Sequence, residues 1–134
     1  MILLDVHYRP VPWKAPRLGK YTTYDPVHKE KQDIRILLRQ TYQGELILDP
    51  VHIEIKFFFT PPKHISKKKL PSYYKNVLPC LTAPDCTNLQ KLFEDCLQGI
   101  VIKKDHQVVK ITSEKLWDTE DHIYCKITKI SQEG

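Results

Sequence analysis

The clearest pattern in the chain lies between residues 51 and 59, where apolar and polar side chains alternate. The apolar positions are Val51, Ile53, Ile55, Phe57 and Phe59, with His52, Glu54 and Lys56 among the residues between them. A period of two places successive side chains on opposite faces of a strand, so the segment predicts a β-strand with one buried face. Residues 2–8, which are rich in strand-forming side chains, predict a first strand.

Two other segments have the spacing of helices. From Asp25-Pro26 to about Thr41 the apolar residues recur at helical intervals and the opposite face is charged, as expected of a helix lying on a core. Asp25 is suited to the N-cap and Pro26 to the first helical position. A second helix is predicted from Asn88 to Gln98, ended by Gly99. Its apolar stripe consists of Leu89, Leu92, Phe93 and Cys96, with Leu97 at the edge.

The remaining segments predict short strands and turns. Residues 100–103 read as a short strand and residues 104–106 as a turn. Two further strands, Val108–Leu116 and His122–Ile130, are predicted to form a hairpin across residues 118–121. The order β-α-β-loop-α-β-β-β favours an α/β (α+β) fold, with a mixed β-sheet and two main helices packed on one face. The length of 134 residues predicts a single domain spanning residues 1–134.

Basic residues gather in two proline-containing segments that predict loops, residues 9–20 and residues 60–72. The net charge of +5 suits an anionic partner such as nucleic acid, and no small-molecule cofactor is expected. The residues expected to contact DNA phosphates are Lys14, Arg17, Lys67, Lys68 and Lys69. Trp13 leaves two interpretations open, because it could help this loop grip the phosphate backbone or could pack inward on the core.

Several classes of protein are disfavoured by composition. No stretch approaches the roughly 20 apolar residues of a membrane span, and the N-terminus makes a poor signal peptide, so a cytoplasmic protein is expected. The cysteines at 80, 86, 96 and 125 form no CxxC pair, which disfavours a zinc ribbon or a thioredoxin-type motif. Free, partly buried thiols are expected instead.

The segment from Pro84 to Lys115 holds the candidate chemistry. Asp85 precedes the second helix, Lys91 and Asp95 share one flank of it, and Asp105 follows the predicted short strand. If that strand ran back along the helix, Asp105 would approach Asp85. Grouped carboxylates bind Mg²⁺, and a lysine beside them stabilises developing negative charge, which suits phosphodiester hydrolysis. Spacing alone leaves an alternative open, in which these residues are a helix cap, a surface ion pair and a turn acid.

The same segment carries a family resemblance. It reads Pro84-Asp85-Cys86-Thr87-Asn88-Leu89-Gln90-Lys91, then Asp95-Cys96-Leu97-Gln98-Gly99, then Lys104-Asp105-His106-Gln107-Val108 and Lys115. In order and spacing this resembles the RusA family of Holliday junction resolvases, whose pattern is Pro-Asp-x-Asp-Asn-Leu-x-Lys, Asp-Ala-Leu, Gly and Asp-Asp-x-Gln-Val. The proline- and arginine-rich opening and the strand ending in Thr60-Pro61-Pro62-Lys63 also resemble the family, so the likeness spans nearly the whole chain.

The resemblance implies a homodimeric endodeoxyribonuclease that resolves four-way DNA junctions by paired strand cleavage in recombination and repair. It implies Mg²⁺ as the cofactor, with Mn²⁺ as an alternative ion. Carried over residue by residue, it assigns Asp85 and Asp105 as catalytic metal ligands and Lys91 as the catalytic lysine.

Two positions depart from the family pattern. Thr87 stands in place of the second acid of the Asp-x-Asp motif, and Lys104 in place of the first acid of the Asp-Asp pair. Thr87 with Gln90 matches a capping box for a helix beginning at Asn88. Asp95, on the flank of Lys91, is then expected to act as the compensating metal ligand. Glu94 projects to the other flank and is a weaker candidate.

These departures keep two further functions open. One is a non-catalytic module that binds branched DNA and has a degenerate metal site. The other is a nuclease that acts on flaps or other branched DNA. The preferred cleavage sequence and the dimer contacts do not follow from the sequence, because both depend on the geometry of loops and surfaces.

Overall fold

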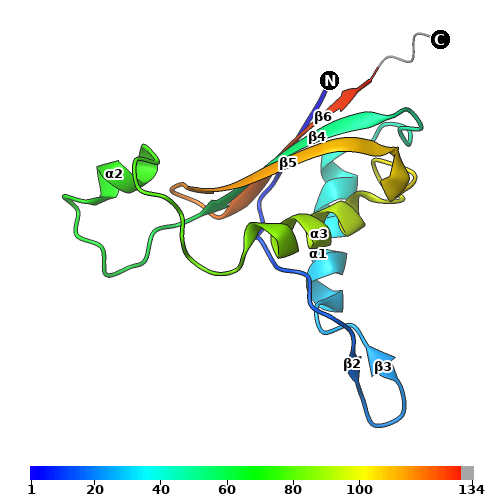
Figure 1. The fold of residues 1–134 in the computed structure, drawn as a ribbon, viewed down its shortest axis with the longest axis horizontal. Helices are drawn as coiled ribbons and strands as arrows, with labels where there is room; N and C mark the ends of the chain where they lie inside the picture. Colours follow the sequence, from blue (N-terminus) through cyan, green and yellow to red (C-terminus); the bar gives the residue numbers. More distant parts are fainter. Residues whose placement is uncertain (131–134) are drawn as a thin grey trace.

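The computed structural model describes residues 1–130, and the last four residues of the predicted domain, 131–134, lie outside the described residues. A four-stranded sheet has the order β1-β6-β4-β5. Its strands are β1 (Ile2–Val6), β4 (Val51–Phe59), β5 (Val108–Trp117) and β6 (His122–Lys129). Strands β4 and β5 are parallel and the other pairs are antiparallel. Helices α1 (His28–Thr41) and α3 (Cys86–Leu97) lie on one side of the sheet (Figure 1), which confirms the expected mixed α+β architecture.

The core forms where the sequence pattern predicts it. The five apolar residues of β4 at odd-numbered positions are all buried, and so are all five apolar residues of the α3 stripe. Phe57 meets Phe93 edge to face, with ring centroids 6.4 Å apart, so the centre of β4 packs directly on α3. This packing fixes the position of α3 on the sheet.

The predicted hairpin of the last two strands is wrong. Strand β4 lies between β5 and β6 and pairs with both of them. The connection of residues 118–121 therefore passes over the end of β4. There the amide of Asp118 donates to the carbonyl of Phe59 at 2.9 Å, and the Asp121 carboxylate accepts from the amide of Thr60 at 2.7 Å. These bonds satisfy the last main-chain groups of β4 and make the crossing stable.

Three boundaries also differ from the predictions. Helix α1 begins at His28, not at Asp25-Pro26, because the Asp25 carboxylate accepts from the amide of Val27 in a turn that precedes the helix. Helix α3 begins at Cys86, two residues before the predicted start. Residues 100–103 form a turn with isolated bridges at Ile102, so they are not a strand. Gly99, with φ of +83°, follows the end of α3 as predicted.

Short elements that project from the sheet begin within the two predicted loops and extend beyond them (Figure 1). Strands β2 (Arg17–Leu18) and β3 (Thr23–Tyr24) pair as one projection, and α2 (Leu70–Tyr74) caps the other. All four cysteines are free, as expected. Within residues 1–130, no helix is long and apolar enough to cross a membrane.

Candidate functional site

Asp85 is the N-cap of α3. Its carboxylate accepts from the amide of Asn88 at 2.9 Å, and the side chain is exposed. The free amides and the dipole at this helix end favour a negative charge at this position. An exposed carboxylate with a fixed position and an incomplete set of hydrogen bonds is a suitable ligand for a hard cation.

The Asp85 cap overturns the predicted capping box. Thr87 lies inside the first turn of α3, one residue beyond its start, and is exposed. Gln90 does not reach back to the helix start, because its side-chain carbonyl accepts from the Ser113 hydroxyl of β5 at 2.8 Å. Asp caps a helix as well as Thr does, so Asp85 can serve as the N-cap two residues before the predicted one.

Lys115 of β5 anchors the segment that leads into Asp85. Its ammonium donates to the carbonyl of Thr82 at 2.6 Å and to the carbonyl of Pro84 at 3.0 Å. Both bonds involve a charged donor, which makes them stronger than neutral ones. The position of the Asp85 main chain is therefore tied to the sheet through one side chain.

Lys91 lies on Trp13. The Lys91 ammonium is 3.5 Å from the centroid of the Trp13 ring, and the amide of Trp13 donates to the carbonyl of Asn88 at 2.9 Å. Trp13 is partly buried and packs against the core cluster, so of the two interpretations of this residue the inward one holds. The N-terminal loop thereby runs along α3 and orients the lysine that the family resemblance assigns to catalysis.

Asp105 lies close to the other end of α3. It is exposed, in the short 3₁₀ helix η1 (Asp105–Gln107). Burial raises the pKa of Glu94, and the nearby charges of Asp105 and Asp95 raise it further. Sequence reasoning ranked Glu94 below Asp95, whereas in the structure Asp105 is near enough to Glu94 for its charge to raise the Glu94 pKa. Asp95 is half-buried, and its main-chain carbonyl accepts from the Arg35 guanidinium at 3.3 Å.

The structure does not bring Asp85 and Asp105 together within one chain. Asp85 precedes α3, whereas Glu94, the neighbour of Asp105, lies nine residues later, about 13 Å along the helix axis. Positions along β5 give the same result. Lys115, which is near Asp85, and Val108, which is near Asp105, are about 23 Å apart along this strand. Within residues 1–130 of a single chain, no three acidic, histidine or cysteine side chains are grouped closely enough to hold an ion.

Gln107 fixes the segment that carries Asp105. Its side-chain carbonyl accepts from the amides of Lys103 and Lys104 at 2.7 and 2.8 Å, and its amide nitrogen donates to the carbonyls of Ile47 and Asp49 at 2.8 and 2.9 Å. Among the described residues, it is the one buried polar side chain, with 8% of its surface exposed. Sequence reasoning gave Gln107 no role of its own, although it lies in the Lys104–Val108 motif.

A comparison with protein families identifies the family of the chain. The family model described as endodeoxyribonuclease RusA matches residues 7–128. The chain belongs to the RusA family of endodeoxyribonucleases. It is also 30% identical over 138 aligned positions to YqaN of Bacillus subtilis (strain 168), a protein described as uncharacterized, with 97% of each chain covered.

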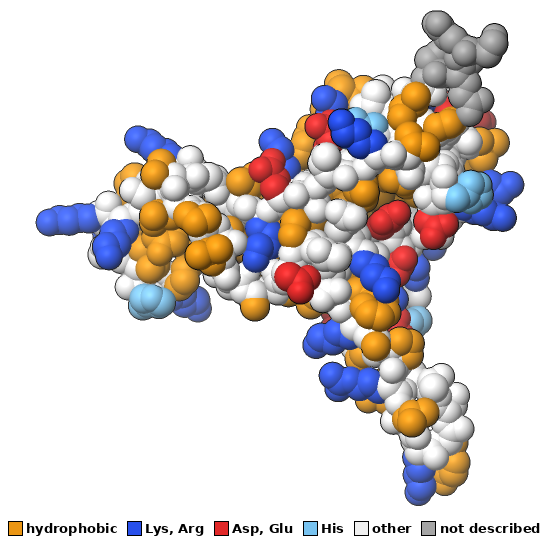
Figure 2. Space-filling model, viewed as in Figure 1, with side chains coloured by type: hydrophobic (Ala, Val, Ile, Leu, Met, Phe, Trp, Pro, Cys, Tyr) orange, Lys and Arg blue, Asp and Glu red, His pale blue; other side chains and the backbone are white. Residues whose placement is uncertain are grey.

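The basic residues of this RusA-family chain lie on its two projections. Arg17 is in β2, Lys14 precedes it, and Lys67, Lys68 and Lys69 lead into α2; all five are exposed. Figure 2 shows lysine and arginine side chains along both projections, separated by the part of the molecule that carries α3. The acidic residues Asp85, Glu94, Asp95 and Asp105 therefore lie on or beside an element that stands between two basic arms.

Proposed function

We propose that this RusA-family endodeoxyribonuclease resolves four-way (Holliday) DNA junctions by paired strand cleavage. The cleavage would require Mg²⁺, with Mn²⁺ as an alternative ion. The observation that carries the proposal is the exposed Asp85 carboxylate at the start of α3, held by Asn88. Hard carboxylate oxygens of this kind suit Mg²⁺. When bound, the ion supplies positive charge for the scissile phosphate and activates water. In this proposal, Asp85 binds the ion.

Lys91 would act on the phosphate directly. Its ammonium is oriented by the Trp13 ring at 3.5 Å and lies on the same helix as Asp85. A fixed cation stabilises the negative charge that grows on the phosphate oxygens during cleavage, and prior orientation removes the cost of rearrangement at that moment. Lys115 supports Asp85 from behind, through the carbonyls of Thr82 and Pro84.

The second acid is proposed to come from another copy of the chain. Ligands of one Mg²⁺ ion lie about 2.1 Å from it, so Asp85 and Asp105 at their separation in one chain would not share an ion. In a homodimer, Asp105 of one copy would complete the site begun by Asp85 of the other, with Glu94 beside it. Asp95, the compensating ligand expected from the sequence, lies next to Glu94 on α3.

Mixing two inactive variants tests this arrangement. Asp85→Asn and Asp105→Asn are each expected to abolish cleavage alone. In a mixed dimer, a shared site would pair an intact Asp85 with an intact Asp105 at one of its two positions, so junction nicking should return. A site formed within one chain would leave both positions damaged, and the mixture would stay inactive. A mixture of the wild-type protein with the Asp85→Asn/Asp105→Asn double variant serves as the control that shows whether subunits exchange between dimers.

The two basic projections would hold the arms of the DNA. Lys14 and Arg17 on one side and Lys67, Lys68 and Lys69 on the other would contact phosphates, with the acids between them. Contacts from separated arms favour a branched substrate over a straight duplex, because one duplex would not follow both. Homodimerisation would double these contacts and match the two-fold symmetry of a four-way junction.

Thr87 supports one rival function, a non-catalytic module that binds branched DNA. Thr87 is exposed and supplies no charge where the family pattern has an acid. Incubation of a labelled four-way junction, a flap and a straight duplex with and without Mg²⁺ distinguishes the functions. Paired cuts in the junction support the resolvase. Tight junction binding without cuts in Mg²⁺ or Mn²⁺ supports the rival, and preferential cutting of the flap supports a flap nuclease.

A further inference from the structure

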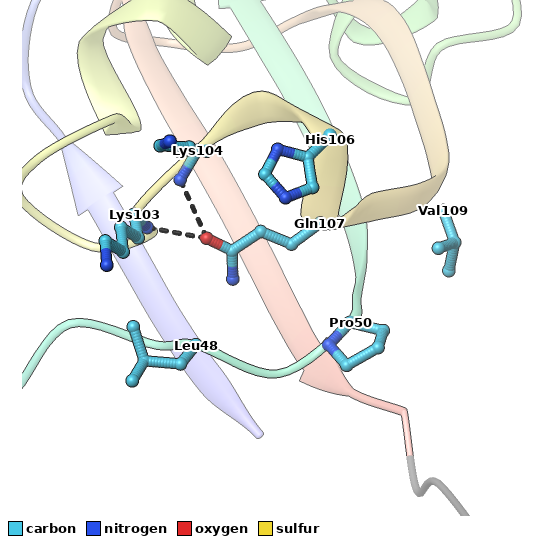
Figure 3. Close-up of a pocket in the computed structure, with 7 residues that line it drawn as sticks. All are labelled: Leu48, Pro50, Lys103, Lys104, His106, Gln107 and Val109. Atoms are coloured by element: carbon cyan, nitrogen blue, oxygen red, sulfur yellow. Dashed lines mark hydrogen bonds between the residues drawn. The ribbon is translucent and has the colours of Figure 1, made fainter.

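A hollow opens between the residues that flank Asp105 in the sequence and the segment of Leu48 and Pro50 (Figure 3). It has a volume of about 510 Å³, and Gln107 lies at its base. Three basic or titratable residues line it, Lys103, Lys104 and His106, together with three apolar residues, Leu48, Pro50 and Val109. Figure 3 shows the Gln107 side chain reaching between the segment of Leu48 and Pro50 and the main chain of Lys103 and Lys104. A hollow of this size can hold a small ligand or one nucleotide.

The lining combines basic and apolar residues, so it favours an anionic ligand that also has an apolar part. None of the seven lining residues is acidic, and Lys103, Lys104 and His106 are all exposed. Leu48 and Val109 present 68% and 60% of their surfaces to solvent. Water contact with these apolar walls is unfavourable, so a flat apolar ligand that covers them would be stabilised. A nucleotide combines such a group, its base, with a phosphate.

The hollow is rigid because Gln107 joins its two walls. All four hydrogen-bonding positions of the Gln107 amide are used, two toward Lys103 and Lys104 and two toward Ile47 and Asp49. The amide of Lys103 also donates to the carbonyl of Ile47. A ligand that enters such a preformed site does not have to order its walls, and this saves free energy on binding.

We propose that this hollow binds one unstacked nucleotide of the branched DNA strand, next to the phosphate that reaches Asp105. The base would cover Leu48, Pro50 and Val109, and its phosphate would meet Lys103 and Lys104. Lys104, which replaces an acid of the family pattern, thereby gains a role in this chain. The inference rests on the proposed function, because it takes DNA as the ligand. Branch points favour this site, since their bases unstack at lower cost than those of a continuous duplex.

The test is a binding measurement in EDTA on a four-way junction that carries 2-aminopurine at single positions around the crossover, whose fluorescence rises when the base unstacks. Wild-type protein should change the fluorescence at one crossover position and leave a duplex of the same sequence unchanged. Val109→Asp, which places a negative charge on the exposed edge of the hollow, should remove that change. Leu48→Glu alters another wall of the hollow and serves as a second test variant if Val109→Asp unfolds.

The charge of the hollow is tested separately. The double variant Lys103→Ala/Lys104→Ala should weaken junction binding and lower the slope of log affinity against log salt by about 1 to 2, because each lost phosphate contact releases one counterion fewer. The double variant Lys56→Ala/Lys126→Ala removes the same charge from β4 and β6 outside the hollow, and should leave the 2-aminopurine signal intact.

The outcomes separate this inference from the proposed function. A wild-type protein that shows the 2-aminopurine change but never cuts in Mg²⁺ supports the hollow and overturns the nuclease. Cutting without any 2-aminopurine change, or with a change that Val109→Asp and Leu48→Glu leave intact, overturns the hollow alone. Loss of the dimer in both wall variants, measured by light scattering, would show that a second copy occupies the hollow and would also overturn the inference. A wild-type protein that does not bind the junction overturns both.

Discussion

The Lys91 ammonium lies 3.5 Å from the centroid of the Trp13 ring. The two residues are far apart in sequence, and the amide of Trp13 is bound to the carbonyl of Asn88, one turn before Lys91. The ring therefore has a fixed position relative to α3, and the lysine is held over it instead of moving freely in solvent. A cation–π contact of this kind contributes about 0.5 to 2 kcal/mol.

Replacing Trp13 should slow the chemical step of cleavage. Trp13→Ala removes the contact, so the single-turnover rate is expected to fall about 2- to 30-fold. Trp13→Phe keeps an aromatic face and should retain more of the rate. Urea unfolding of both variants controls for lost packing, because Trp13 also contacts the core cluster. Equal rates for Trp13→Ala and the wild-type protein at saturating DNA would show that the ring does not orient Lys91 for catalysis.

Lys115 is expected to act on Asp85 by positioning it. Lys115→Ala frees the carbonyls of Thr82 and Pro84, so the Mg²⁺ concentration for half-maximal cleavage should rise about tenfold, equivalent to about 1.4 kcal/mol. The dissociation constant for the junction should hardly change. Lys115→Arg keeps a charged donor and should recover part of the Mg²⁺ affinity, whereas Lys110→Ala on the same strand should behave as wild type. A purely structural role would lower stability in Lys115→Ala without moving its Mg²⁺ requirement.

His122 joins two acids at the end of the sheet where β6 begins. Its ring nitrogens lie 2.7 Å from Asp5 and 2.7 Å from Asp118, and its ring stacks on Phe58 with centroids 4.3 Å apart. Burial alone would lower the His122 pKa, but the hydrogen bonds with Asp118 and Asp5 outweigh it, and the pKa is raised above 6.5. The hydrogen bond from His122 lowers the pKa of Asp118.

The raised pKa predicts a pH dependence of stability. A group whose pKa is higher in the folded than in the unfolded state stabilises the fold fully below the unfolded value, and this contribution is lost as pH rises through the folded value. The free energy of unfolding of the wild type should therefore exceed that of His122→Gln most at about pH 5.5, and the difference should shrink toward about pH 8.5. The Asp118 contribution is lost only when the pH falls through its lowered pKa. Urea unfolding between about pH 5.5 and about pH 8.5 measures the His122 contribution, and a constant difference between wild type and His122→Gln would contradict the assignment.

The projection that carries α2 is expected to contact DNA. Changing Lys67, Lys68 and Lys69 together to Ala should weaken junction binding and lower the slope of log affinity against log salt by up to about 2.7, since each phosphate contact contributes about 0.9. A control that removes Lys29, Lys56 and Lys126 subtracts the same charge from α1 and the sheet. An unaltered slope in the first variant, or an equal loss in both, would show that this projection makes no specific phosphate contacts.

The parts of the fold that the sequence predicted are those where burial of one face dictates spacing. The alternation of Val51 to Phe59 and the stripe from Leu89 to Leu97 are of this kind, and both are buried as expected. The pairing of β5 with β4 was not predictable in the same way, because alternation tells which face of a strand is buried and not which strand lies beside it. Strands β2 and β3 have two residues each, too few for any period to appear.

The candidate site was predictable in its residue types and less so in its arrangement. Asp85 and Lys91 follow from the motif, and Trp13 beneath Lys91 does not, since that contact joins segments distant in sequence. Glu94 was ranked below Asp95 from the sequence. Which flank faces Asp105, however, depends on the turn after Gly99, where a strand had been expected. The separation of Asp85 and Asp105 follows from that same turn.

The central claim is that Asp85 makes this chain a metal-dependent junction nuclease, and a single-turnover Mg²⁺ titration with a labelled four-way junction tests it most directly. Asn caps helices as well as Asp does, so Asp85→Asn should fold and bind the junction like the wild type. The wild type should cut the junction with a saturable Mg²⁺ dependence, and Asp85→Asn should show no cleavage at any Mg²⁺ concentration. Cleavage by Asp85→Asn at the wild-type rate, with the same Mg²⁺ requirement, would contradict the account.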